Sequence, residues 1–196
     1  AEGWQQQVLA VADNLDCGGL FDLLSDSLLA AHLPAPYTAE KVYLNVTHLT
    51  AADAKAAIVA AINSGKLLVN YIGHASKTAW ATEQIFGVAS MSSLTNGNRQ
   101  PIILAMACSD GYYQMPYTSQ YFATAEVVTR ADGKGAVASW SPSGEGVASG
   151  HDRLNRGFFD ALLTDGVETL GEATYAGKIE LWASGSNYDL LDTYLL

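Results

Sequence analysis

The chain has 196 residues, 49% of them apolar, which is enough for one domain with a substantial core. Twenty acidic against ten basic residues give a formal net charge of −10, which disfavours nucleic acid and anionic membrane surfaces as partners. No window approaches the uncharged apolar length of a membrane span. The two cysteines, Cys17 and Cys108, form neither a disulfide framework nor a paired metal motif.

Alternating strand and helix patterns fill the first part of the chain. Residues 8–12 are a continuous apolar run typical of a buried strand, and residues 20–33 have helix-compatible apolar spacing that a proline stops. A short strand is expected over 41–46. A helix is predicted to begin after Thr50, because a threonine hydroxyl can accept a hydrogen bond from a backbone N–H of the first turn. Gly65 is expected to end this helix, because glycine is favoured at the C-terminus of helices.

Two later apolar runs each end on a reactive residue. Residues 66–73 lead to His74, and residues 101–107 lead to Cys108. Both runs are typical of strands buried on both faces of a parallel sheet, whose carboxyl ends form the ligand crevice. Neighbouring strands lie about 4.8 Å apart. If these two are neighbours, a thiol and an imidazole stand side by side, which is the minimal apparatus for acyl transfer through a thioester.

The remaining segments complete an α/β pattern. From 77 to 100 the chain is mixed. The later elements expected are a helix over 119–130, a strand over 135–140, a Ser/Gly-rich loop over 141–150, helices over 152–163 and 169–182, and a last strand within 188–196. Such alternation predicts an α/β domain with a mainly parallel sheet flanked by helices on both faces. Without repeats or a linker, residues 1–196 are expected to form a single catalytic domain or subdomain.

His74 and Cys108 each have a structural alternative. A histidine at a turn is often a hydrogen-bonded structural residue, and a free cysteine is often buried and inert. The tight polar turn Ser109-Asp-Gly111 that follows Cys108 favours display at a crevice. Two reactive residues that end two separate strands are harder to explain structurally than either one alone.

Four short segments carry a family resemblance. They are Tyr71-Ile-Gly-His74-Ala-Ser76, Thr78-Ala-Trp80, Leu94-Thr-Asn96 and Ala107-Cys108-Ser-Asp-Gly111. Together they resemble the gingipain-type cysteine peptidases, and weaker similarity extends over nearly the whole chain. The resemblance implies a caspase-like fold, with the catalytic His after one strand and the Cys after the next. The family commonly has Gly directly after the His, where this chain has Ala75.

The resemblance implies a cysteine endopeptidase that needs no cofactor. Cys108 would be the nucleophile and His74 the base, with the backbone N–H groups of Cys108 and Ala75 as oxyanion donors. Asp13, or Asp16 in its place, would orient the histidine. The structural alternative for this acidic turn is an Asx turn that opens a loop, and a structural calcium ion held by its oxygens is a weaker possibility.

The substrate pocket implied by the resemblance is lined by Ile72, Met106, Asp22, Glu145 and Trp140. An acid at the base of an apolar tube selects a long cationic side chain, because its charge needs a partner. Cleavage after Arg or Lys is therefore expected, with Glu145 slightly favoured over Asp22. The alternative is that both acids are solvated and that the pocket prefers an apolar residue.

The resemblance also implies peptide or protein substrates, secretion or display at the cell surface, and an N-terminal subdomain or pro-segment that completes a longer polypeptide. Two other interpretations stay open. The chain could be a non-catalytic caspase-like binding or structural module of a surface protein. It could also be a peptidase that works only after its further subdomain docks.

Overall fold

The computed structural model describes residues 3–115 and 122–196, and its centre is a six-stranded sheet. The strands follow the order β2-β1-β3-β6-β7-β8. The first five pair in parallel, and β8 pairs antiparallel with β7 at one edge. The bounds are Gln7–Ala12 for β1, Thr38–Tyr43 for β2, Leu68–Ile72 for β3, Ile102–Met106 for β6, Ala138–Pro142 for β7 and Tyr194–Leu195 for β8. A short antiparallel pair, β4 (Ala79–Trp80) and β5 (Phe86–Gly87), follows β3.

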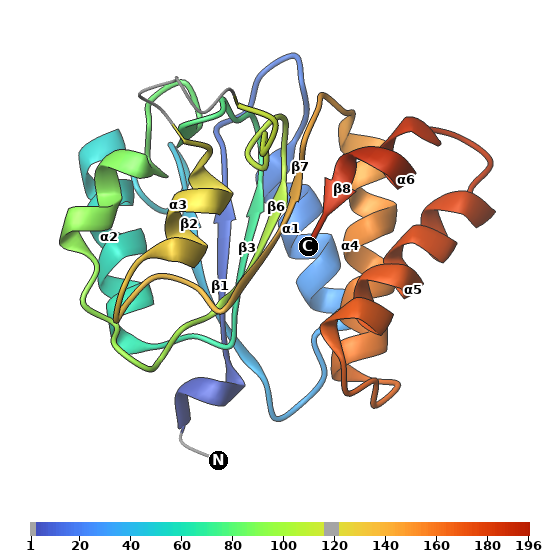
Figure 1. Cartoon of the computed structure of the whole chain (residues 1–196), viewed down its shortest axis with the longest axis horizontal. Coiled ribbons are helices and arrows are strands. Elements are labelled where there is room, and N and C mark those ends of the chain that lie inside the picture. Colours follow the sequence, from blue (N-terminus) through green and yellow to red (C-terminus); the bar gives the residue numbers. More distant parts are fainter. Residues whose placement is uncertain (1–2, 116–121) are drawn as a thin grey trace.

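Helices cover both faces of the sheet (Figure 1). Helices α1 and α4 pack on one face, while α2 and α3 pack on the other. Helix α5 lies on the outer side of α4. The bounds are Phe21–His32 for α1, Ala51–Ser64 for α2, Thr124–Arg130 for α3, Ala148–Leu163 for α4, Leu170–Ala183 for α5 and Asp189–Thr193 for α6. No helix in the described ranges is long and apolar enough to cross a membrane.

The central strands are buried on both faces, which explains their continuous apolar sequences. All five residues of β3 and all five of β6 are buried. Alternate residues feed two separate cores, because side chains of a strand point to opposite faces. In β3, Leu68 and Ile72 pack toward α1 and α4, while Val69 and Tyr71 pack toward α2.

The register of β3 against β6 sets the geometry of the candidate site. Ile72, the last residue of β3, pairs with Met106, the last residue of β6. Two residues further on in each chain segment come His74 and Cys108. The expectation that the two strands are parallel neighbours is therefore confirmed, and both reactive residues leave the sheet at the same edge.

Most elements match the sequence expectations, with several differences in their bounds. The strand expected over 135–140 is β7, which runs from Ala138 to Pro142, and the helix expected over 152–163 begins at Ala148, so the loop expected over 141–150 is shorter. The second strand, expected over 41–46, begins earlier and ends at Tyr43. Of the helix expected over 119–130, residues 119–121 lie outside the described residues, and α3 begins at Thr124. The tail expected as a strand is mainly α6, followed by the two residues of β8. Acidic residues in the first turn of α6 favour a helix there, because its N-terminus is partly positive.

Candidate active site

His74 and Cys108 line one cavity of about 290 Å³ at the carboxyl end of the sheet. The Cys108 side chain is partly buried, and its Sγ lies 3.7 Å from the carbonyl oxygen of Gly146. The His74 side chain is 48% exposed, and its ring meets the edge of the Phe21 ring with centroids 5.3 Å apart. An accessible imidazole and a thiol therefore share one site.

The turn after Cys108 has the sharp geometry expected of a displayed side chain. Ser109 has a φ of 55°, in the left-handed region that non-glycine residues rarely adopt. Two backbone hydrogen bonds fix this turn against the loop after β7. The Ser109 N–H donates to the Gly144 carbonyl at 2.8 Å, and the Gly111 N–H donates to the Pro142 carbonyl at 2.9 Å. The segment directly after Cys108 is thus held against the end of β7 and the loop that follows it.

Asp13 and Asp16 contact His74 in different ways. Asp13 is buried, and its Oδ2 accepts the backbone N–H of His74 at 3.1 Å. Burial raises the pKa of Asp13, although the N–H groups of His74 and Asn14 partly oppose this. The imidazole Nε2 instead faces Asp16, at 3.2 Å from Oδ1 and 3.1 Å from Oδ2. Asp13, the first choice from sequence, therefore positions the backbone, and Asp16 contacts the ring.

The exposed Asp16 carboxylate is held by its own turn. The backbone N–H of Gly18 donates to Asp16 Oδ1 at 2.6 Å, and this hydrogen bond lowers the pKa of Asp16. Gly18 also presses against the imidazole, since a Cβ built on it would lie 2.5 Å from His74 Nε2. A side chain at this position would push the imidazole away from the acidic turn.

A buried network that sequence reasoning missed connects the His74 loop to the Cys108 turn. The Tyr71 hydroxyl donates to the His74 carbonyl, and its ring stacks on Trp80 with centroids 4.5 Å apart. The Trp80 indole donates to Asp110 Oδ1 at 2.9 Å, and Ser141 Oγ donates to Asp110 Oδ2 at 3.1 Å. Complete burial raises the pKa of Asp110 to about 6. The available signal was Tyr71, a hydroxyl inside the apolar run of residues 66–73.

The pocket residues predicted from sequence are only partly brought together. Ile72 and Met106 do line the cavity beneath His74 and Cys108, while Asp22, Glu145 and Trp140 are not among its lining residues. Trp140 is fully buried and packs on the rings of α4 and β8 because its side chain faces the core. Sequence reasoning missed several lining residues, among them Cys17 and His151, which bring a second thiol and a second imidazole to the cavity. The lining residues are Cys17, Gly18, Phe21, Ile72, Gly73, His74, Met106, Cys108, Gly146, Val147, Ala148 and His151.

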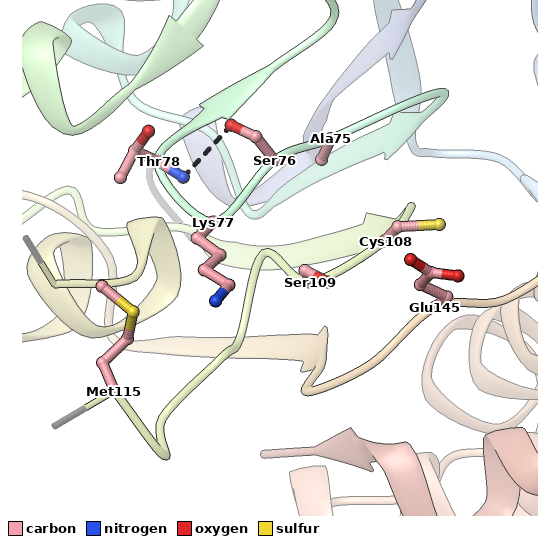
Figure 2. Close-up of a pocket in the computed structure, with 8 residues that line it drawn as sticks. All are labelled: Ala75, Ser76, Lys77, Thr78, Cys108, Ser109, Met115 and Glu145. Carbon is pink, nitrogen blue, oxygen red and sulfur yellow. Dashed lines mark hydrogen bonds between the residues drawn. The ribbon is translucent and has the colours of Figure 1, made fainter.

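A second cavity, of about 580 Å³, meets the first at Cys108 (Figure 2). Residues 75–78 line one side of it, Cys108 and Ser109 line another, and Met115 completes it. The Glu145 side chain lies on the Cys108 side, whereas Lys77 extends from the opposite loop. Lys77 Nζ stands 3.7 Å from the centroid of the Tyr112 ring. This cavity therefore has one acid and one base among its described lining residues.

The described residues contain no cluster of side chains that could bind a metal ion. No group of three or more His, Cys, Asp or Glu side chains there is arranged to hold an ion. The carboxylates of Asp13 and Asp16, the turn considered for calcium, are directed to different parts of His74.

Comparison with known proteins decides the family. A model of peptidase family C25 matches residues 1–196. The chain belongs to peptidase family C25. Gingipain R2 of Porphyromonas gingivalis is 42% identical to this C25 chain over 83 residues, which are 41% of the chain and 11% of that protein. Lys-gingipain W83 of the same organism is 27% identical over 143 residues, 64% of the chain and 8% of that protein.

Solved structures confirm the caspase-like α/β fold of this C25 chain. The crystal structure of the Arg-specific cysteine proteinase gingipain R superposes with a TM-score of 0.78 at 27% identity, covering 97% of this chain and 45% of that one. A structure of gingipain pro- and mature domains in complex gives the same TM-score. The chain thus spans less than half of the solved relative and about a tenth of the curated one. The gingipain-type resemblance read from the sequence is confirmed.

Proposed function

We propose that this C25 chain is the catalytic part of a cysteine endopeptidase. One observation carries the proposal: His74 and Cys108 follow the paired ends of adjacent parallel strands and line the same cavity. The chemistry uses side chains and backbone N–H groups, so it calls for no cofactor. The structural calcium ion considered from sequence stays a prediction without a supporting ligand cluster among the described residues.

The reaction begins when Cys108 Sγ attacks the carbonyl carbon of the scissile peptide bond. His74 takes the thiol proton and then gives it to the leaving amine. Water hydrolyses the thioester that remains, again with His74 as the base, and the thiol is restored. The backbone N–H groups of Cys108 and Ala75, two residues that line the second cavity, would hold the oxyanion. A donor of this kind is worth about 2.7–4 kcal/mol of transition-state stabilisation.

The two acids of the first loop take separate roles in this proposal. Asp16, which contacts the His74 ring, would orient the imidazole and stabilise its protonated form. Asp13, which binds the His74 backbone, would position the residue without touching the reacting atoms. Both are needed for a productive ring orientation, but only Asp16 interacts with the charge that develops during the reaction.

Cleavage after Arg or Lys is the finer prediction from sequence, and Glu145 is the acid that can support it. Glu145 lies beside Cys108 in the second cavity (Figure 2), whereas Asp22 lines neither cavity. Two relatives carry Arg or Lys specificity in their names. A peptide library profiled with the wild type and with Glu145→Gln tests this prediction. A preference for Arg or Lys that the substitution abolishes would support it.

The wider context also rests on the likeness to gingipains. We propose peptide or protein substrates, secretion or display at the cell surface, and a further N-terminal subdomain or pro-segment that works with this chain. A large exposed apolar face on α5, which includes Tyr175, Ile179 and Trp182, is available to such a partner. A peptidase that becomes active only after docking stays within this proposal.

Labelling with a peptide that carries a thiol-reactive warhead tests the proposed function. Rapid, selective modification of Cys108, with hydrolysis of peptide substrates that Cys108→Ala abolishes, is the expected result. Cys17→Ala is the control for selectivity: Cys17 lines the same cavity, and this variant should still be labelled rapidly at Cys108. Slow labelling of both cysteines, with no hydrolysis, would favour the non-catalytic module instead.

A further inference from the structure

The two proposed oxyanion donors belong to separate loops. The Ala75 N–H lies in the loop after β3, and the Cys108 N–H lies in the turn after β6. Both residues line the second cavity (Figure 2). Such donors stabilise an oxyanion only when each stands about 2.7–3.1 Å from it. The separation of the two loops therefore has to be fixed for both donors to act together.

Trp80 is tied by its backbone to the loop that carries Ala75. Ala75 and Trp80 form an antiparallel β-bridge. The next residue, Ala81, donates its N–H to the His74 carbonyl at 2.8 Å. These backbone bonds close the segment 74–81 on itself, so the position of Trp80 sets the position of the first oxyanion donor.

The side chain of Trp80 reaches across to the other loop. It is fully buried, and its indole N–H donates to Asp110 Oδ1 at 2.9 Å. Asp110 comes two residues after Cys108. The rings of Tyr71 and Phe86 pack on the indole with centroids 4.5 and 4.7 Å away, which fixes its direction. One side-chain hydrogen bond therefore joins the loop of the first donor to the turn of the second.

Asp110 is itself anchored to the sheet and to α3. Its Oδ2 accepts the Ser141 hydroxyl of β7 at 3.1 Å, and its backbone carbonyl accepts the Ala125 N–H at 3.1 Å. The neighbouring Thr124 N–H donates to the Lys77 carbonyl at 2.8 Å. The first turn of α3 thus binds the Cys108 turn and the Ala75 loop at adjacent residues, which supports the link that the indole makes.

Burial of Asp110 has a cost in stability that packing does not explain. The residue is 1% exposed, and none of the ion pairs among the described residues includes it. A buried carboxylate without an opposite charge is unfavourable, even when neutral donors bind it. Proteins depart from the rules of burial mainly at functional sites. The place of this residue, between two loops of the site, indicates what the function is.

We propose, on the basis of the peptidase function above, that Asp110 and Trp80 are positioning residues whose hydrogen bond sets the spacing of the Ala75 and Cys108 N–H groups. Neither side chain lines either cavity, so neither touches the substrate. Without this bond the Ala75 loop is free to shift relative to Cys108. A displaced donor weakens a contact that forms only in the transition state, so kcat falls while KM is unchanged.

Two reactions of the same thiol test the proposal in Trp80→Phe, which removes the indole N–H and keeps a ring to stack on Tyr71. Peptide hydrolysis passes through an oxyanion, whereas alkylation of Cys108 by iodoacetamide does not. We expect kcat to fall by roughly 10- to 100-fold, because a displaced donor loses part of the 100- to 1,000-fold that a missing one costs. KM should stay within about twofold and the alkylation rate within about threefold of the wild type.

Variants of Asp110 separate the hydrogen bond from the charge. Asp110→Leu offers the indole no acceptor and should lower kcat as Trp80→Phe does. Asp110→Asn keeps an oxygen for the indole, and its amide NH₂ can donate to the Ser141 hydroxyl oxygen, so it should retain most of the kcat that the leucine variant loses. Trp140→Phe is the matched control, because it makes the same change at a fully buried indole in the other core. It should leave the ratio of hydrolysis to alkylation unchanged.

Equal losses of hydrolysis and alkylation in Trp80→Phe would overturn the inference, because they would report a general disruption of the site. An unchanged kcat would overturn it as well, and so would an Asp110→Asn enzyme that is as impaired as Asp110→Leu. If Trp80→Phe does not fold, Asp110→Leu decides by the same ratio of the two rates. Absence of both hydrolysis and Cys108 labelling in the wild type would instead overturn the proposed function, and this inference with it.

Discussion

Asp13 holds His74 through the main chain and not through the imidazole: its Oδ2 accepts the His74 N–H at 3.1 Å, while the ring nitrogen faces Asp16. The buried carboxylate of Asp13 therefore fixes the backbone that follows β3, and the exposed carboxylate of Asp16 contacts the imidazole ring. Within four residues of sequence, Asp13 therefore supports the structure, and Asp16 is placed to affect the rate of the reaction. It also makes the two acids distinguishable by experiment.

Asp13→Ala should lower the free energy of unfolding by about 2 kcal/mol, because it leaves the partly buried N–H groups of His74 and Asn14 without their acceptor. Asp16→Ala should leave the unfolding midpoint unchanged and lower kcat, since only the support of the ring is lost. Urea denaturation and peptide hydrolysis measure the two effects. The reverse result, a stable Asp13→Ala and an unfolded Asp16→Ala, would contradict this assignment.

The strands and the two reactive residues could be predicted from sequence because β3 and β6 are buried on both faces. Continuous apolar runs mark such strands, and in a parallel sheet their carboxyl ends must meet at one edge. Adjacency alone then predicts that His74 and Cys108 lie at the same edge, and the observed pairing of Ile72 with Met106 shows that the two strands end level. No knowledge of the loops is needed for that step, so this part of the site was accessible from the start.

The other site residues depend on loop geometry that sequence periodicity does not encode. Whether Asp13 or Asp16 faces the imidazole is decided by the turn that the Gly18 N–H closes. His151 lines the cavity from the start of α4, which begins at Ala148 and not at residue 152 as expected. The direction of Trp140 was readable from the strand pattern, because in β7 Ala138, Trp140 and Pro142 alternate with Ser139 and Ser141; the family resemblance assigned it to the pocket instead.

Asp110 should make stability fall as the pH rises from about 4 to about 6. Burial raises its pKa from 3.8 to about 6, so the folded state binds the proton more tightly than the unfolded chain does. Its ionisation therefore lowers the free energy of unfolding by about 3 kcal/mol. This loss is complete above pH 6 and absent below pH 4. Asp110→Asn should remove this contribution, so that the stability of the variant rises from pH 4 to pH 6 through the opposite effect of His151. Urea titrations at several pH values in this window measure it, and an unchanged slope would contradict the assignment.

His151 should act in the opposite direction over a similar window. Its pKa falls from 6.5 to about 4 on burial, so the unfolded chain binds the proton more tightly. Stability is complete above pH 6.5 and declines by about 3 kcal/mol as the pH falls to 4. In the wild type this trend offsets that of Asp110, so each becomes visible in the single variant of the other. In His151→Met the free energy of unfolding, measured in urea, should decrease steadily from pH 4 to pH 6.

Asn70 and Asn155 form a reciprocal amide pair inside the core, between the middle of β3 and α4. Asn70 Nδ2 donates to Asn155 Oδ1 at 2.8 Å, and Asn155 Nδ2 donates to Asn70 Oδ1 at 3.1 Å. Both side chains are almost fully buried. This pair connects the strand that leads to His74 with the helix that supplies His151, so its loss should affect stability and the alignment of the cavity together.

Either single substitution, Asn70→Leu or Asn155→Leu, should lower the free energy of unfolding by about 2–3 kcal/mol, because each leaves one buried amide without a partner. The double variant should recover at least half of that loss, since two leucines of similar size leave no orphaned polar group. A double-mutant cycle by urea denaturation measures the coupling. Losses that simply add in the double variant would show that the two amides are not coupled, and that packing volume alone sets the cost of replacing them.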